Sequence, residues 1–74
     1  APVVSVEKTK NSATLAPLTT RQKEVALLII EGLSNREIAS RLGIAVATVK
    51  DHVHAILERL HLPSRVALIA ASRI

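Results

Sequence analysis

The 74-residue sequence contains no cysteine and no aromatic residue, and each absence excludes a class of protein. Without cysteine the chain has no disulfide and no thiolate metal site, so an apolar core must hold a small fold together. Modules that bind single-stranded nucleic acid stack bases on Phe, Tyr or Trp, and this sequence lacks that contact. Duplex DNA, which proteins bind through backbone charge and groove edges, remains a candidate partner.

The sequence also lacks a long apolar run. No stretch approaches the roughly 18 apolar residues of a membrane span, and the N-terminus lacks the order of charged and apolar residues of a signal peptide. We therefore expect a soluble, cytoplasmic protein with no membrane partner. The net charge of +4 and the pI near 10.4 favour a polyanionic partner, although a basic domain without such a partner has the same composition.

Composition divides the chain into two parts. Residues 1–17 mix Ser, Thr, Asn, Lys and Pro without periodicity, which is typical of a flexible linker. Residues 18–74 carry the periodic apolar pattern of a folded domain. We expect the linker to come from a missing upstream domain, in keeping with a sequence that does not begin with methionine.

Capping boxes mark the first two helices. A Thr-x-x-Gln box begins at Thr19 and predicts a helix over about residues 20–31, after which a glycine ends it. A Ser-x-x-Glu box begins at Ser34 and predicts a helix of about eight residues that ends at Gly43. Ala39 within this helix is small enough to let a crossing helix approach closely.

Two further helices follow. Only residues 43–45 separate the second helix from a third at about 46–60, which is the helix-turn-helix pattern. Ser64 follows a proline and is a good cap for a fourth helix at about 65–73. The sequence therefore predicts an all-α domain of four helices.

The third helix has two different faces. Aliphatic side chains recur at helical spacing and should point into a core, namely Val49, Val53, Ile56 and Leu60. Short or polar side chains fall on the other side, namely Ala47, Lys50, Asp51, His54 and Glu58. A helix with these two faces is suited to lie in a groove.

Five segments in order, from Leu18 to Ile69, resemble the C-terminal DNA-binding domain of LuxR/NarL/GerE-type transcription factors. The segments are L-T-T-R-Q-K-E-V, E-G-L-S-N-R-E-I-A, R-L-G-I, A-T-V-K-D-H and L-P-S-R-V-A-L-I. The resemblance implies a four-helix LuxR/NarL-type helix-turn-helix fold, double-stranded DNA as the ligand and a homodimer through the last helix. It also implies that four residues face the DNA, namely Thr48, Lys50, Asp51 and His54, and that Val49, Ile56 and Leu60 hold the recognition helix in place.

Two positions depart from the family's pattern. The family often has Ser where this chain has Ala45, so the N-terminal cap of the third helix should be weaker here. The family often has Gly where this chain has His61, so a left-handed turn there should carry some strain. Neither change touches the DNA-facing residues.

The DNA-facing residues differ in the chemistry that they offer. Lys50 is the strongest candidate, because it can reach a guanine edge or a phosphate. Thr48 can contact a phosphate or a thymine methyl, or it only helps to cap the helix. Asp51 can accept from a cytosine amine or pair with His54, which adds a phosphate contact if it is protonated. The alternative for each of these side chains is that it is merely exposed to solvent. Ala47, with its short side chain, is the fifth candidate DNA-binding residue on this helix.

Basic residues outside the third helix are candidate contacts to the DNA backbone. Arg36 is the first of them, because it follows the free N-terminus of a helix. The others are Arg21, Lys23 and Arg41. For Arg65 we expect a structural ion pair with an acid at the edge of the core, such as Glu24.

The fourth helix is apolar nearly all round. Leu68 should close the core, and four residues should then remain outside as a dimer interface, namely Val66, Ile69, Ala70 and Arg73. The alternative is that this stripe covers the core of this domain or of a missing neighbour.

We therefore predict sequence-specific duplex DNA binding by a bacterial-type transcriptional regulator, with the helix at about 46–60 in the major groove. The output domain of a two-component response regulator is one such regulator domain that the resemblance allows. We expect a dimer on paired half-sites about one helical turn apart, with RNA polymerase as a candidate partner. We expect no metal site, since His52 and His54 fall on nearly opposite helix faces. We also expect no enzyme activity and no cofactor, since the sequence has no phosphate-binding glycine loop and no Ser, His and acid set that the fold would bring together. The alternative from another class is a helical protein-interaction module without DNA binding.

Overall fold

The computed structural model describes residues 15–72 of the chain. These residues form four α-helices and no strand, which confirms the predicted all-α class. The helices are α3 (Thr20–Ile30), α4 (Asn35–Leu42), α5 (Val46–Leu60) and α6 (Arg65–Ser72). Their bounds follow the prediction, except that α3 ends one residue earlier and the predicted last residue of α6 lies outside the described residues.

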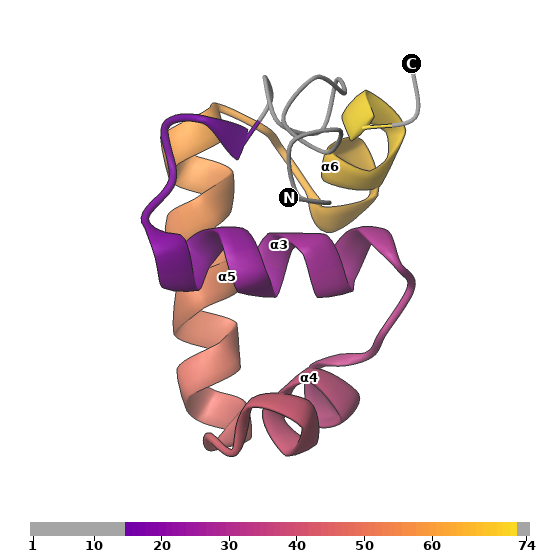
Figure 1. Cartoon of the computed structure of the whole chain (residues 1–74). Helices are drawn as coiled ribbons and strands as arrows, with labels where there is room; N and C mark the ends of the chain where they lie inside the picture. Colours follow the sequence, from indigo (N-terminus) through magenta and orange to yellow (C-terminus); the bar gives the residue numbers. More distant parts are fainter. Residues whose placement is uncertain (1–14, 73–74) are drawn as a thin grey trace, which may run out of the picture.

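Helix α5 is the longest element, and the other three helices pack against it. Figure 1 shows α3 crossing in front of α5, with α4 beside the first turns of α5 and α6 at the opposite end of the molecule from α4. The short connection between α4 and α5 keeps these two helices together as the helix-turn-helix pair. One side of α5 is therefore covered by the other helices, and the opposite side is available to a partner.

The core takes side chains from all four helices. Val49 and Ile56 of α5 are fully buried, and Val53 and Leu60 lie half-buried at the edge of the core. This confirms the inner face predicted for α5. The other buried side chains are Leu15, Leu18, Val25, Ala26, Ile29, Ile38, Ala39 and Leu68. Since Leu15 is among them, the packed part of the chain extends three residues before the predicted boundary at residue 18.

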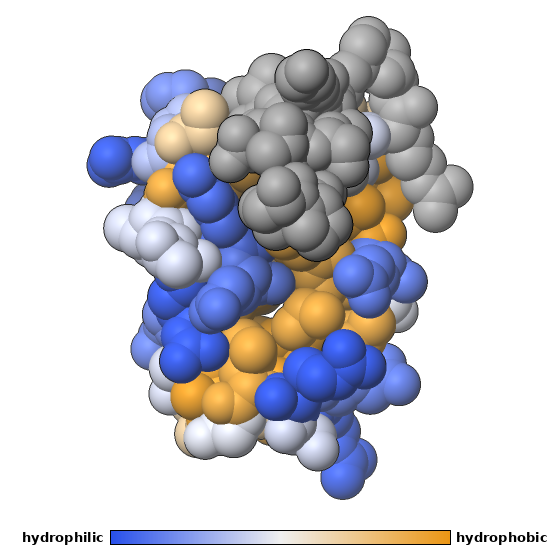
Figure 2. Space-filling view, in the orientation of Figure 1, coloured by the Kyte–Doolittle hydropathy of each residue, from blue (hydrophilic) through white to orange (hydrophobic). Residues whose placement is uncertain are grey.

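A core of this size leaves apolar edges at the surface. Figure 2 shows apolar surface below α3 and near its C-terminal end, with hydrophilic side chains interspersed. Aliphatic residues that pack against the core and remain partly exposed include Leu27, Leu28, Ile30 and Leu33. This arrangement is ordinary for a small domain, in which too few residues are available to cover the core completely.

Both predicted capping boxes are present. The Gln22 amide donates to Thr19 Oγ1 at 3.2 Å, and the Thr19 amide donates to Gln22 Oε1 at 3.0 Å. The Glu37 amide donates to Ser34 Oγ at 3.1 Å, and the Ser34 amide donates to Glu37 Oε1 at 2.7 Å. Each box satisfies backbone amides that a helix start leaves without an intrahelical acceptor, and so fixes where α3 and α4 begin.

The second capping box should make stability depend on pH. The hydrogen bond from the Ser34 amide, followed by that from its hydroxyl, holds the pKa of Glu37 below its ordinary value of 4.5. The unfolded chain therefore binds a proton at this carboxyl before the folded chain does. The contribution to stability is complete above the ordinary pKa and is lost as the pH falls through the lower, folded pKa.

We expect the Glu37→Gln variant to lose less stability than the wild type between about pH 5 and about pH 3. The glutamine oxygen can still accept from the Ser34 amide, but it does not titrate. Urea unfolding at a series of pH values measures the difference. Glu31→Gln, which removes an exposed carboxylate outside either capping box, is the control for the change in net charge. Parallel pH profiles for Glu37→Gln and wild type would contradict the prediction.

Candidate DNA-binding interface

The turn between α4 and α5 sets the start of the candidate interface. Gly43 ends α4 in the left-handed region with φ 69° and ψ 37°, which favours glycine. The Ile44 amide donates to the Ala39 carbonyl at 3.0 Å and closes the turn. Ala39 itself is buried, as expected for a small residue where helices approach closely. Three residues thus suffice to redirect the chain into α5.

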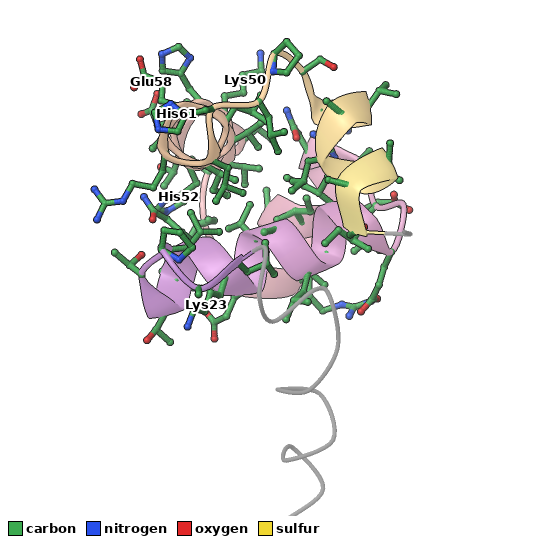
Figure 3. All side chains as sticks on the ribbon, turned by 90° about the horizontal axis from the view of Figure 1, so that it is seen from above. Lys23, Lys50, His52, Glu58 and His61 are labelled. Atoms are coloured by element: carbon green, nitrogen blue, oxygen red, sulfur yellow. The ribbon has the colours of Figure 1, made fainter. Side chains whose placement is uncertain are left out.

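The outer face of α5 is exposed as predicted. Lys50 and Glu58 lie on the side of α5 that points away from α3 (Figure 3). The exposed side chains of this helix include Ala47, Thr48, Lys50, Asp51, His54 and Glu58. The structure therefore brings the five predicted α5 site residues to the surface of one helix, beside the helix-turn-helix turn.

These residues are spread around the axis of α5. At about 100° per residue, Ala47, Asp51 and His54 lie near the centre of the exposed side. Lys50 lies at one edge of this side and Thr48 at the other, about 160° apart around the axis. A flat partner surface cannot contact both edges equally. A groove with two walls can.

One predicted alternative is an ion pair between Asp51 and His54. In the structure His54 contacts Glu58 instead. His54 Nε2 lies 3.6 Å from Glu58 Oε2, four residues further along the helix. This spacing aligns two side chains closely, and glutamate reaches further than aspartate. Both partners are more than 70% exposed, so the contact adds little stability, and it becomes an ion pair only when His54 is protonated.

The candidate backbone contacts differ in their surroundings. Arg21 Nη1 lies 3.3 Å from Glu24 Oε1, so this guanidinium is already paired within α3. Lys23 lies on the opposite side of the domain from Lys50 (Figure 3). The exposed arginines of α4 are Arg36 and Arg41. Arg36 and Arg41 therefore remain the candidate backbone contacts that lie on the helix-turn-helix pair itself.

The prediction that Arg65 pairs with Glu24 is wrong. The Arg65 guanidinium donates through Nη1 to Asn35 Oδ1 and through Nη2 to the Leu33 carbonyl at 2.5 Å. Glu24 instead contacts Arg21, which is one helical turn away on the same helix. The expected structural role of Arg65 stands, but its partners lie at the start of α4.

Helix α6 buries Leu68 completely, as predicted, and exposes Val66 and Ala70. Val66 is 73% exposed. Ile69 differs from the prediction, because it is half-buried and packs against the core. It lies only about 100° around the axis from Leu68 and so borders the buried side. Arg73 lies outside the described residues.

The start of α5 has the predicted weak cap. Ala45 occupies the N-cap with φ −73° and ψ 151°, and no side chain there binds the first-turn amides. His61 ends the helix in the left-handed region with φ 57° and ψ 41°, again as expected. Helix α5 is therefore positioned by its packing more than by its ends.

We expect Ala45→Ser to stabilise the domain by about 1 kcal/mol, because the N-cap backbone is already in the conformation from which a hydroxyl accepts a first-turn amide. Urea unfolding measures the change. Ala47→Ser places the same hydroxyl inside the helix and serves as the control, which should not stabilise the domain. Equal effects of the two substitutions would show that capping is not the cause.

One tertiary contact on α5 has no counterpart in the sequence prediction. Arg59 Nε donates to the Pro17 carbonyl at 3.2 Å, across 42 residues of chain. Beside it lies an open hollow lined by Gln22, Ala55, Glu58 and Arg59. The hydrogen bond fastens the segment before α3 to the C-terminal half of α5. No local pattern indicates such a contact, because it depends on how α3 and α5 cross.

The histidines of α5 do not form a metal site with each other. His52 is half-buried on the side of α5 that faces α3, whereas His54 is exposed (Figure 3). Within residues 15–72, no three His, Asp or Glu side chains gather as a group that could hold a metal ion. Over the same residues, no helix has the length and apolar character needed to cross a membrane.

Comparison with known proteins agrees with this geometry. The family described as "Bacterial regulatory proteins, luxR family" (GerE) matches residues 16–72. The chain is 40% identical over 57 residues to the transcriptional regulatory protein DesR of Bacillus subtilis, covering 77% of this chain and 29% of DesR. It is 50% identical over 48 residues to the response regulator protein VraR of Staphylococcus aureus, covering 65% of this chain and 23% of VraR. No solved structure gives a significant match.

The chain thus spans less than a third of the length of these two relatives. The family match covers most of the chain, including all four helices and the turn between α4 and α5. The chain belongs to the luxR family of bacterial regulatory proteins, and its four described helices form a helix-turn-helix DNA-binding domain of that family.

Proposed function

We propose that the domain recognises a specific duplex sequence by placing the exposed face of α5 in the major groove. The observation that carries the proposal is the arrangement of α5 itself. Val49 and Ile56 are fully buried and fix the helix, while short and polar side chains are exposed on its opposite side, directly after the helix-turn-helix turn. This is the geometry in which a recognition helix contacts base edges.

The positions around the axis assign a role to each residue. Ala47, Asp51 and His54 face the base edges, where the small Ala47 permits close approach and Asp51 accepts from a cytosine amine. Lys50 and Thr48 face the two walls of the groove. Lys50, at one edge of the exposed side of α5, reaches a phosphate or a guanine base edge. Thr48, at the other edge, reaches a phosphate or a thymine methyl.

Attraction to the DNA backbone comes mainly from outside α5. Within residues 46–60, Lys50 and Arg59 are offset by Asp51 and Glu58 when the histidines are neutral. Arg36 is exposed in the first turn of α4, the first helix of the helix-turn-helix pair. It is the principal contact to the DNA backbone. Such contacts position the protein without selecting a sequence, so α5 supplies selectivity and α4 supplies affinity.

The domain acts as a homodimer through α6 on two half-sites about one helical turn apart. Val66, which is 73% exposed, and the exposed Ala70 support this, because they form an apolar surface on the side of α6 opposite the buried Leu68. Ile69 contributes at the border of this surface.

The name of VraR, a response regulator protein, supports a role for this domain as the output end of a response regulator. The proposal also includes a cytoplasmic location and RNA polymerase as a further partner. The domain binds DNA rather than catalysing a reaction. A helical protein-interaction module is the alternative, since the same exposed faces suit a protein partner.

Selection from a random duplex pool, followed by salt titration with the selected duplex, tests the proposal. We expect a selected site whose affinity falls steeply and linearly with the logarithm of salt concentration, as phosphate contacts release counterions. Failure to retain any duplex at low salt would overturn the proposal. A salt-insensitive complex with a protein partner would favour the alternative.

A further inference from the structure

Arg65 donates two long-range side-chain hydrogen bonds, more than any other side chain in residues 15–72. Its guanidinium donates to Asn35 Oδ1 and to the Leu33 carbonyl, across 30 and 32 residues. These two acceptors flank Ser34, the N-cap of α4. One side chain at the start of α6 therefore holds the chain on both sides of the N-cap residue of α4.

The start of α4 is held from three directions. Ser34 is engaged by Glu37 in the capping box. The Leu33 amide donates to the Leu28 carbonyl of α3 at 3.1 Å. Arg65 adds the connection to α6, and it uses two different nitrogens of a planar group, which fixes direction as well as distance.

Stability alone does not account for an arginine at this place. Arg65 and Asn35 are half-buried, and within residues 15–72 no carboxylate lies within ion-pair distance of the guanidinium. A partly buried cation without an opposite charge costs desolvation energy. A cation beside the first residue of α4 also opposes the helix dipole. An apolar contact would join the two helices without these costs.

We propose that Arg65 is a positioning residue for DNA binding, which holds the first turn of α4 so that Arg36 meets the DNA backbone. Arg36 directly follows Asn35, whose side chain Arg65 binds. A small rotation of this turn would move the long Arg36 side chain away from a phosphate without unfolding the helix. This inference rests on the proposed contact between Arg36 and the backbone.

The test compares Arg65→Lys, Arg36→Ala and the double variant with the wild type on the selected duplex. Lysine keeps the charge but cannot make the planar two-nitrogen contact. We expect each single variant to weaken binding roughly 2- to 30-fold. Each should also lower the slope of log affinity against log salt by about one, with the preference among sequences unchanged.

The double variant is the decisive measurement. If Arg65 acts through Arg36, adding Arg65→Lys to Arg36→Ala should cause little further loss, and the double variant should bind like either single variant. If Arg65 affected binding independently of Arg36, the losses would be additive. If it only stabilised the fold, Arg65→Lys would leave the binding of folded protein unchanged. Arg59→Lys, which alters another arginine that donates to a carbonyl, is the matched control and should keep the wild-type slope.

Thermal unfolding of every variant verifies that binding is measured on folded protein. If Arg65→Lys fails to fold, Asn35→Ala removes one acceptor of the same contact and takes its place. Additive losses, or an unchanged slope in the Arg65 or Asn35 variant, would overturn this inference while the proposed function stands. An unaffected Arg36→Ala variant would overturn the backbone contact and this inference together, and a wild type that binds no duplex would overturn the proposed function as well.

Discussion

Replacing Lys50 with alanine should weaken binding to the selected duplex by about 5- to 150-fold, which corresponds to about 1–3 kcal/mol. Lys50 is exposed on the side of α5 that points away from α3, and it is the single lysine of that helix (Figure 3). In the proposed arrangement, the charge of Lys50 faces one wall of the groove, so its removal should cost a contact to the DNA. Fluorescence anisotropy with labelled duplex at fixed salt measures the change.

Lys23→Ala is the matched control for this prediction. It removes the same charge from another exposed lysine, which lies on the opposite side of the domain (Figure 3). We expect it to change affinity far less than Lys50→Ala does. Both variants should unfold at nearly the wild-type urea concentration, since both side chains are exposed. Equal losses in the two variants would show that only overall charge matters and would remove Lys50 from the recognition face.

Replacing Ile56 with alanine should lower the free energy of unfolding by about 2–5 kcal/mol. Ile56 is fully buried in the core that joins all four helices. Three carbon atoms are lost from a closely packed site, and the cavity that remains adds to the lost transfer free energy. Small domains have little stability to spare, so a loss of this size should unfold much of the population at room temperature. Urea unfolding at 25 °C measures it.

Ile56→Val provides a graded control, with an expected loss of about 0.5–1.5 kcal/mol. Leu57→Ala truncates the neighbouring half-buried side chain and should cost less than Ile56→Ala. DNA binding of Ile56→Ala should recover when the temperature is lowered enough to refold it, whereas Lys50→Ala should stay weak. An Ile56→Ala variant as stable as Leu57→Ala would contradict the assigned position in the core.

The helices and their limits were largely predictable because their signals are local. The capping boxes at Thr19 and Ser34 and the left-handed Gly43 depend on residues within one turn of chain. The inner face of α5 follows from the helical repeat, which places Val49 and Ile56 on one side whatever the partner helix is. The candidate recognition face is the complement of that side, and its contact with DNA stays a prediction.

The amino-acid sequence by itself determined the four helices, the turn between α4 and α5, and which side of α5 is exposed. Only the tertiary structure decided the partners of Arg65 and Arg59, the burial of Leu15 and the half-burial of Ile69. Helix periodicity fixes a side chain's direction around its own axis. It says nothing of which helix lies opposite, so contacts across 30 or 42 residues appear only when the crossing of the helices is known.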